Sequence, residues 1–325
     1  MGQRILITGG CGFFGTWIIK RLLDDGDHPI VLDVAKTTKR WEMIMSAEEI
    51  ARIPFHQGQI DDTDAVLALC AKEKPDAIIH LAALQVPTCR DKPLAGAKVN
   101  VIGTLNIFEA AKARRDADGV LPRIVYASSA AVFGPDAEYA ETHVGDQAAL
   151  KPTTHYGAYK VCNEACAKAY WIANQIPSVG LRPLTVYGPG RDTGMTSFPT
   201  RALAAALLGQ TFDIPFTGTT AYIHMREVAD MFVTAARSPM TDGLVYTVGG
   251  DVVDMPAFVA AADRVIPGAA KLITISGAPL PITSKVDDAS LRRTYPGLLR
   301  IPLAQGLSET VAVFKQLQQR GALTV

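Results

Sequence analysis

The 325-residue sequence contains no apolar run approaching the roughly 18 residues that a membrane-spanning helix needs. Its first residues, MGQRILITGG, lead directly into a strand pattern and lack the form of a signal peptide. Lysine plus arginine equals aspartate plus glutamate at 32 each, so no net charge attracts nucleic acid or an anionic membrane. We therefore expect a cytoplasmic protein that binds neither nucleic acid nor membranes.

Cysteines are few, odd in number and scattered, which makes a poor disulfide framework. Cys162 and Cys166 lie one helical turn apart, but no cluster of His or Cys stands near them to complete a tetrahedral metal site. We expect reduced thiols and no metal. The five cysteines are Cys11, Cys70, Cys89, Cys162 and Cys166.

Hydrophobic residues make up 48% of the chain and charged residues 20%, as in a globular protein. Short apolar or β-branched runs alternate with segments of helical periodicity, a pattern typical of βαβ units around a parallel sheet. The predicted class is therefore α/β, with a doubly wound parallel sheet. The predicted strands are 4–8, 29–34, 54–57, 77–81, 123–128, 179–186 and 244–248, and the main predicted helices are 13–24, 64–72, 94–114 and 156–174.

A glycine-rich segment, TGGCGFFG at residues 8–15, connects the first predicted strand to the first predicted helix. The start of such a helix carries free N–H groups and the positive end of the helix dipole, and glycines let a pyrophosphate approach the backbone closely. Nucleotide binding by Gly9, Gly12 and Gly15 is favoured over a tight turn that merely needs positive φ.

An acidic residue, Asp33, ends the second predicted strand, eighteen residues after Gly15. A carboxylate there can accept hydrogen bonds from both hydroxyls of an adenosine ribose, and it repels a 2′-phosphate. NAD is therefore favoured over NADP. Lys36, Lys39 and Arg40 follow closely enough to keep NADP open as the alternative.

A tyrosine and a lysine, Tyr156 and Lys160, are four residues apart in HYGAYKVCNEA, so both lie on one face of a predicted helix. A neighbouring ammonium favours the phenolate of tyrosine and brings its pKa toward the working range of a general base. Ser128 and Ser129 end a central predicted strand, at the edge where open α/β sheets bind ligands. A serine there can donate a hydrogen bond to a substrate oxygen.

Taken in order, these segments resemble the extended short-chain dehydrogenases/reductases of the NAD-dependent epimerase/dehydratase family. The likeness covers about the first 190 residues and includes HLAA at 80–83, NVIGT at 100–104, YASSAAVFG, YGAYK and LRPLTVYGPGR. It implies that Tyr156 is the catalytic acid or base, that Ser129 is the catalytic serine, and that Lys160 holds the nicotinamide ribose and lowers the tyrosine pKa. It also implies a homodimer formed through the helices 94–114 and 156–174.

The resemblance also implies where the cofactor binds. In the family an acidic residue followed by an apolar one commonly holds the adenine; here that pair is Gln59 and Ile60, and Asp61 or Asp62 can substitute. The cofactor-binding residues implied are Gly9, Gly12, Phe13, Phe14, Gly15, Asp33, Gln59, Ile60, Leu81, Ala82, Ala83, Asn100, Tyr156, Lys160 and Pro183.

Departures from the family pattern narrow the reaction. Ala130 and Ala131 stand where sugar-nucleotide dehydratases and decarboxylases carry an acidic residue, which argues against both reactions. Thr185 replaces an asparagine that many nucleotide-sugar epimerases place on the substrate phosphate, and Thr220 and Ala221 replace an arginine that clamps the pyrophosphate. The expected substrate-binding residues are Gln85, Ser128, Ser129, Ala130, Thr185 and Arg191.

Arg191 has two open interpretations. A guanidinium just past a strand end can bind a substrate carboxylate or phosphate bidentately, or it can brace a surface loop. Arg201 and Arg226 are other candidates for gripping a phosphate.

The sequence thus favours an NAD-dependent dehydrogenase or reductase of a small sugar, sugar acid or similar polyol. The nearest alternative is an NAD-dependent sugar or nucleotide-sugar epimerase, because oxidation and its reversal use the same residues. A nonenzymatic dinucleotide sensor would not need the Ser/Tyr/Lys set. We predict a Rossmann-type NAD-binding domain over 1–188, joined by the strand near 244–248, and a substrate-binding region over 189–243 and 249–325.

Overall fold

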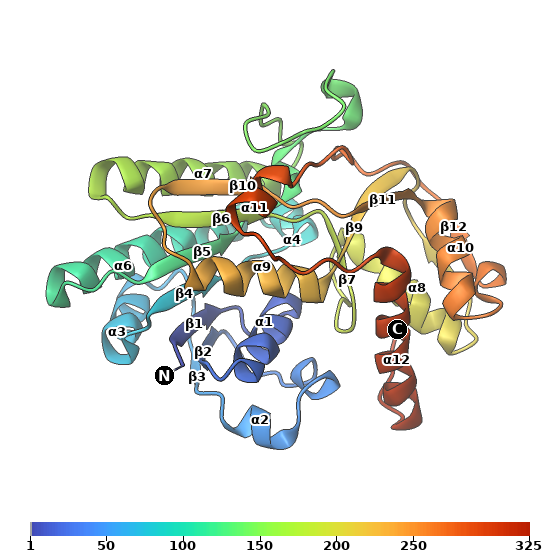
Figure 1. The fold of residues 1–325 in the computed structure, drawn as a ribbon, viewed down its shortest axis with the longest axis horizontal. Helices are drawn as coiled ribbons and strands as arrows, with labels where there is room; N and C mark the ends of the chain where they lie inside the picture. The colour runs from blue at the N-terminus through green and yellow to red at the C-terminus, as the bar shows by residue number, and fades with distance from the viewer. Residues whose placement is uncertain (1) are drawn as a thin grey trace.

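The computed structural model describes residues 2–325 and contains a seven-stranded sheet as its central layer (Figure 1). The strand order is β3-β2-β1-β4-β5-β6-β10, and every neighbouring pair is parallel. This arrangement confirms the predicted α/β class. The strands are β1 (Arg4–Thr8), β2 (His28–Asp33), β3 (Phe55–Gln57), β4 (Ala77–His80), β5 (Arg123–Ala127), β6 (Ser178–Arg182) and β10 (Gly243–Thr247).

Helices cover both faces of the sheet because successive strand side chains point to opposite sides. In β1, Ile5 and Ile7 belong to one buried cluster, which includes apolar residues of α1 and α9. Leu6 belongs to a second cluster, which includes residues of α3, α6 and α7. The covering helices are α1 (Phe13–Asp24), α3 (Thr63–Glu73), α6 (Gly103–Asp118), α7 (His155–Asn174) and α9 (Met225–Arg237).

The predicted strand 179–186 is in fact two strands. β6 ends at Arg182, and Pro183 has no N–H with which to continue the ladder. Two residues later β7 (Thr185–Tyr187) begins, and it pairs with β9 in a different sheet. The predicted helix 94–114 is likewise divided, into α5 (Pro93–Ala97), a π-helical turn η2 (Lys98–Ile102) and α6.

A second region is built around its own core and two small sheets, ordered β11-β9-β7 and β12-β8. Its α9, which falls inside the segment predicted as substrate-binding, returns to the large sheet and packs against α1. This region contains β8 (Phe212–Ile214), β9 (Thr219–His224), β11 (Asp251–Asp254), β12 (Ile273–Ile275), α8 (Phe198–Leu207), α10 (Met255–Val265) and α12 (Leu303–Gln319).

Shorter elements complete the chain. They are α2 (Ala47–Ala51), α4 (Val86–Asp91), α11 (Ala289–Thr294), and the 3₁₀ turns η1 (Trp41–Met43), η3 (Ala130–Val132), η4 (Asp136–Glu138), η5 (Met195–Ser197) and η6 (Ala269–Lys271). Within residues 2–325, no helix combines the length and apolar character that crossing a bilayer requires.

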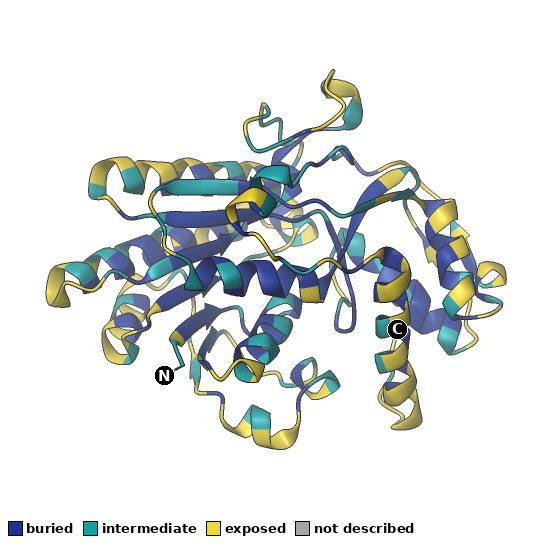
Figure 2. Cartoon of the chain, viewed as in Figure 1, coloured by how far each residue is buried: buried dark blue, intermediate teal, exposed yellow. Residues whose placement is uncertain are grey.

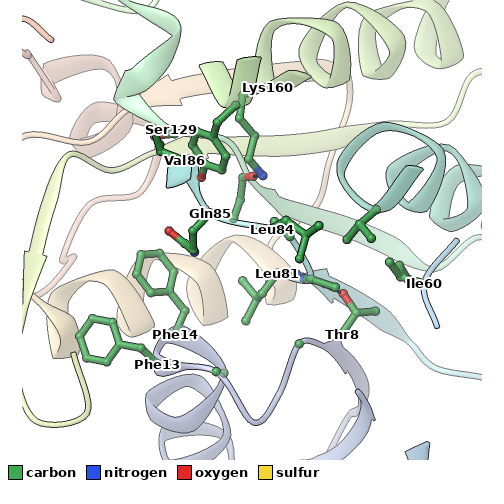
Figure 3. A pocket seen from close by; sticks show the side chains of 18 of the residues that line it. Thr8, Phe13, Phe14, Ile60, Leu81, Leu84, Gln85, Val86, Ser129 and Lys160 are labelled. Carbon is green, nitrogen blue, oxygen red and sulfur yellow. Dashed lines mark hydrogen bonds between the residues drawn. The ribbon is translucent and has the colours of Figure 1, made fainter. Parts of the chain in front are cut away.

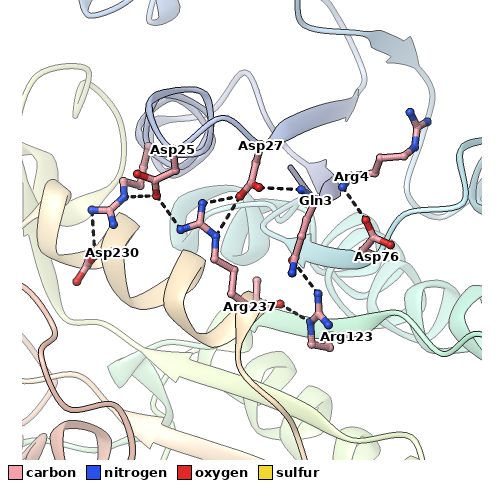
Figure 4. A network of polar contacts seen from close by, with 10 residues as sticks. Gln3, Arg4, Asp25, Asp27, Asp76, Arg123, Asp230 and Arg237 are labelled. Carbon is pink, nitrogen blue, oxygen red and sulfur yellow. Dashed lines mark hydrogen bonds and ion pairs between the residues drawn. The ribbon is translucent and has the colours of Figure 1, made fainter. Parts of the chain in front are cut away.

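A polar network joins the ends of α1 and α9 on the side of the sheet away from the carboxyl ends of the strands (Figure 4). Arg237 donates to Asp27 through Nε at 3.0 Å and Nη2 at 2.5 Å, and to Asp25 through Nη1 at 2.7 Å. Asp27 also accepts the backbone N–H of Gln3 at 2.8 Å. The network therefore fixes α9 to the beginning of the chain.

We expect Arg237→Met to lower the free energy of unfolding by about 1–3 kcal/mol, because Asp27 keeps a buried charge and loses two donors. The control is Arg226→Met, which removes a more exposed pair with Glu309 and should cost less than about 1 kcal/mol. Urea denaturation measures both losses. Equal losses for the two variants would contradict this account of the network.

Candidate active site

A cavity of about 440 Å³ opens at the carboxyl edge of the large sheet, where the chain leaves β1, β2, β4 and β5. In Figure 3, Ser129 and Lys160 lie at one end of it, and Phe13 and Phe14 come from the start of α1 below them. Parallel strands deliver their loops to a common edge, which is why residues from distant parts of the sequence meet here.

The glycine loop has the geometry that its sequence predicts for a close approach of ligand and backbone. Gly9 has φ of 72°, in the left-handed region that favours glycine, and a Cβ there would lie 2.9 Å from the backbone nitrogen of Ala82. A Cβ on Gly15 would lie 2.5 Å from the Cα of Gly10, so this glycine permits the tight packing of α1 on the loop.

The first turn of α1 is open toward the cavity. Its N-cap is Gly12, which has no side chain to cap the free N–H groups of Phe13, Phe14 and Gly15. These N–H groups and the helix dipole suit an anion such as the pyrophosphate of a dinucleotide. The loop and helix therefore fit the phosphate portion of NAD.

Asp33 faces the same cavity and is held in place by the loop. Its Oδ2 accepts from the N–H of Cys11 at 2.9 Å, and its Oδ1 accepts from the N–H of Val34 at 2.8 Å. Each oxygen keeps a lone pair with which to accept a ribose hydroxyl.

The basic residues that kept NADP open are engaged in contacts with other parts of the protein, although Arg40 also lines the cavity. Arg40 donates to the carbonyls of Cys11 and Gly190 and to Asp192, at 3.1, 3.2 and 2.7 Å. Lys39 contacts Thr324. Lys36 lies over the ring of Phe55, at 5.8 Å from its centre. These contacts favour NAD.

The remaining walls of the cofactor end come from the loops after β3 and β4. Asp62 caps α3 by accepting from the N–H of Ala65, so Asp61 is the acid left facing the cavity. The hydroxyl of Thr8 accepts from the N–H groups of Leu81 and Ala82 and holds the second loop. The expected residues that line this end are Gln59, Ile60, Leu81, Ala82, Ala83 and Pro183.

Tyr156, Lys160 and Ser129 meet at the other end of the cavity. Burial raises the pKa of Tyr156 to about 12, against a hydrogen bond from Ser129 and the charge of Arg191, which lower it. The expectation that Lys160 lowers this pKa toward the working range is therefore wrong for the protein without a ligand: burial has the larger effect, and the cation that opposes it is Arg191. Burial lowers the pKa of Lys160 to about 8. Lys160 Nζ donates to the carbonyl of Ala127 at 2.5 Å and lies 5.5 Å from the centre of the Tyr156 ring.

A buried ion pair beneath the serines is the feature that the sequence interpretation missed. Glu164 accepts from Nε and Nη2 of Arg182 at 2.8 and 2.7 Å, and from the hydroxyl of Ser128 at 2.5 Å. Both charged side chains are about 95% buried. The available sequence signal was the position of Glu164, one further helical turn after Tyr156 and Lys160. Because Ser128 donates its only hydroxyl hydrogen to Glu164, it can only accept hydrogen bonds from other groups.

Three expected site residues lie off the cavity lining. Asn100 uses its amide on the backbone of Leu84, donating at 3.0 Å and accepting at 2.7 Å, so it positions the loop after β4. Ala130 is fully buried within η3. Thr185 is also buried, and its hydroxyl forms a hydrogen bond with the hydroxyl of Thr220 at 2.7 Å.

The expected substrate residues Gln85, Ser128, Ser129 and Arg191 do line the cavity. Arg191 donates from Nη2 to the hydroxyl of Thr196 at 2.9 Å and stacks on Phe13, with 5.6 Å between Cζ and the ring centre. Within residues 2–325, no group of three or more His, Cys, Asp or Glu side chains could hold a metal ion.

The buried Lys160 predicts a stability change with pH. Its folded pKa, about 8, lies below its ordinary value of 10.5, so the unfolded chain binds more protons between these values and stability rises with pH there. The free energy of unfolding of the native protein minus that of Lys160→Met should therefore increase between pH 7 and 10, by on the order of 1–2 kcal/mol.

The control for this experiment is Lys168→Met, which removes an exposed lysine from the same helix and leaves the buried surroundings of Lys160 unchanged. Chemical denaturation at four pH values gives both differences. If the difference in free energy of unfolding between the native protein and Lys160→Met does not change with pH, the ammonium group of Lys160 is not desolvated by burial.

Comparison with known proteins agrees with this arrangement. The chain is 30% identical to a UDP-glucose 4-epimerase of Mycolicibacterium smegmatis, over 98% of this chain and 100% of the relative. Its fold is similar to that of a Thermus thermophilus UDP-glucose 4-epimerase solved with NAD, with a TM-score of 0.80, 24% identity, and coverage of 96% and 99% of the two chains. A partial consensus L-threonine 3-dehydrogenase has a similar fold, with a TM-score of 0.81, 20% identity, and coverage of 96% and 99%.

The family model of the NAD-dependent epimerases and dehydratases matches residues 5–249, well over half of the chain. The matched residues include the glycine loop, Asp33 and the Ser/Tyr/Lys group that meet at the cavity. The chain belongs to the NAD-dependent epimerase/dehydratase family and is an NAD-dependent enzyme.

Proposed function

We propose that the chain is a dehydrogenase that acts on a hydroxyl group of a small sugar, sugar acid or similar polyol. The observation that carries this proposal is the meeting of Tyr156, Ser129 and Lys160 at one end of a cavity whose other end suits a dinucleotide. NAD, when bound there, supplies the hydride acceptor.

The protein's own residues handle the proton. Ser129 Oγ accepts from the N–H of Ala131 at 3.1 Å, which leaves its hydroxyl proton free for the substrate oxygen or for Tyr156. Tyr156, as phenolate, takes the proton of the substrate hydroxyl. The charge of Arg191 and the hydroxyl of Ser129 lower the pKa of Tyr156 and so favour that phenolate against the effect of burial, and Lys160 holds the nicotinamide ribose. In the opposite direction Tyr156 returns the proton, and the site reduces a carbonyl.

The positions that would bind phosphate groups support a small substrate over a nucleotide diphosphate. Where the family pattern carries phosphate ligands, this chain has Thr185 and Thr220, which are buried and hydrogen-bond to each other. Arg226 is paired with Glu309 at 2.7 Å, and Arg201 stacks between Phe198 and Phe212. Neither arginine lines the cavity.

The second candidate is a nucleotide-sugar epimerase, which the full-length likeness to the M. smegmatis UDP-glucose 4-epimerase favours. An epimerase oxidises a carbon and then reduces it from the other face, and it uses the same Tyr, Ser and Lys. It shows no net change in its cofactor.

A release-and-turnover experiment separates the two candidates. The purified protein is denatured and the released nucleotide is measured; intact protein is then given NAD with sugars, sugar acids and UDP-sugars while NADH absorbance is followed. Net reduction of NAD by a free sugar or acid supports the dehydrogenase. Tightly held NAD with isomerisation of a UDP-sugar and no net reduction overturns it.

We expect Tyr156→Phe to lower turnover by about 10²–10⁴-fold, because the acid–base group is lost while the cavity keeps its shape. NADH affinity, measured by fluorescence titration, should stay within about twofold. The matched control is Tyr159→Phe on the same helix, whose hydroxyl bonds the carbonyl of Pro93 instead. Unchanged turnover in Tyr156→Phe would instead favour a dinucleotide sensor.

We also propose a homodimer formed through α5, η2, α6 and α7. The outer surfaces of these helices expose large apolar side chains, with Leu94 81%, Ile102 42% and Ile172 67% exposed. The exposed residues of α7 (Figure 2) include the small Ala158, Ala165 and Ala169. A face of exposed apolar and small residues is typical of helices that pack against a partner.

Ile172→Glu should convert the dimer to a monomer, because it places a charge in the apolar contact between the helices. The control is Val252→Glu, an exposed valine of β11 on the far side of the molecule, which should leave the assembly unchanged. Size-exclusion chromatography with light scattering gives the mass. Equal masses for both variants would place the contact elsewhere.

A further inference from the structure

Arg191 is a cation in the cavity without an anionic partner among the described residues. No carboxylate of residues 2–325 lies within ion-pair distance of Arg191. The neighbouring residue in the sequence, Asp192, is paired with Arg40 at 2.7 Å instead. Its Nε is buried and has no hydrogen-bond partner in this part of the chain. A half-buried guanidinium whose Nε lacks a partner and which lacks a counter-charge is costly for the protein alone, and it is satisfied when an anion binds.

The space beside this guanidinium is kept open by a glycine. A Cβ on Gly194 would lie 3.3 Å from Arg191 Nη2 and also 3.3 Å from Gln85 Oε1, so the two side chains flank one small gap. The φ of Gly194 is 91°, which other residues rarely adopt. Arg191 and Thr196 thus offer donors suited to a small planar anion, and Gln85 places its amide oxygen, an acceptor, on the other side of the gap.

The rest of the substrate end is apolar. Leu184 and Met195 line it from the second region, and Leu280 and Ile282 line it from the segment 277–288. That segment is fixed above the serines, because Thr283 donates its N–H to the carbonyl of Gly134 at 2.7 Å and its hydroxyl to Asp136 at 2.5 Å. Many hydroxyl groups buried against such a wall would lack partners, at a cost of about 1–3 kcal/mol each.

We propose, resting on the dehydrogenase function above, that the substrate is a short-chain hydroxy acid. Arg191 binds its carboxylate with Thr196, Ser129 and Tyr156 bind its hydroxyl, and its hydrocarbon part packs on Leu184, Met195, Leu280 and Ile282. In the reaction the carbon that bears the hydroxyl gives a hydride to NAD and the hydroxyl gives its proton to Tyr156. A carbonyl forms, and the carboxylate is unchanged.

This assignment keeps the dehydrogenase reaction of the proposed function and replaces the sugar, sugar acid or polyol with a hydroxy acid that carries fewer hydroxyl groups. A sugar acid offers the carboxylate but carries hydroxyls that the apolar wall cannot pair. A polyol lacks the carboxylate. A nucleoside diphosphate carries more charge than one guanidinium with two neutral neighbours neutralises.

Binding can be tested without turnover by using butanoate, which has no hydroxyl to oxidise. Isothermal titration of the NAD-loaded protein should show butanoate binding that the neutral butanamide lacks. Arg191→Met keeps the aliphatic stem and should weaken butanoate binding at least tenfold; the matched control Arg201→Met, a stacked arginine off the cavity, should not. Equal butanoate affinity in both variants overturns the assignment.

Further measurements distinguish other roles for Arg191. If Arg191→Met weakens NADH binding tenfold, the guanidinium serves the cofactor pyrophosphate, and the assignment fails. If UDP competes with butanoate and binds more tightly, the site belongs to a nucleotide sugar, and the assignment also fails. If Arg191→Met does not fold, Arg191→Lys can be used, because it keeps the charge but loses the two parallel N–H donors of the guanidinium. Its affinity for butanoate should be weaker than that of the native protein but still measurable.

The two proposals fail separately. Arg191-dependent binding of butanoate, together with no NADH formation from 2-hydroxybutanoate or 3-hydroxybutanoate, would retain the carboxylate site and refute the dehydrogenase. NADH formation from sugars without butanoate binding would retain the dehydrogenase and refute the hydroxy acid.

Discussion

All seven strands of the large sheet run in one direction, and the geometry of the site depends on this constraint. Each strand delivers the chain to the same edge, so the glycine loop, Asp33 and the serines meet there. More than a hundred residues of sequence separate the first of these from the last. Because helices cover both faces of the sheet, this edge and the loops beyond it are where a ligand can reach the backbone. These residues are thus close together because all the strands run in the same direction.

Features with local physical causes could be predicted from the sequence. The glycine loop is fixed by the turn between one strand and one helix, and the alignment of Tyr156 with Lys160 follows from helical periodicity alone. The end of β6 was missed because an apolar run continues through Pro183, and only the partner β9, encoded far downstream, draws β7 into another sheet. The hydrogen bonds that Ser128 and Arg182 donate to Glu164 likewise depend on packing between α7, β5 and β6. No spacing rule within one segment could predict them.

The formal net charge of zero conceals an uneven internal distribution. Glu164 and Arg182 neutralise each other in the interior, where they fix the serine segment. Lys160 and Arg191, by contrast, line the cavity without a carboxylate partner within residues 2–325, and burial lowers the pKa of both. The protein therefore keeps uncompensated positive charge where we propose that a phenolate forms and that an anionic substrate binds. Such unpaired charges cost stability, and they are typical of functional sites.

The two-residue passage from β6 to β7 also has a mechanical consequence. Pro183 is held by its carbonyl, which accepts from the N–H of Ala130 at 3.0 Å, and too few residues remain there to form a hinge. The second region is attached again where β9 runs into α9, which packs on the large sheet and against α1. Two rigid attachments prevent the region from swinging as a hinged lobe. Any closure over a ligand is therefore limited to small sliding of packed side chains and of the loops that carry Arg191 and Ile282.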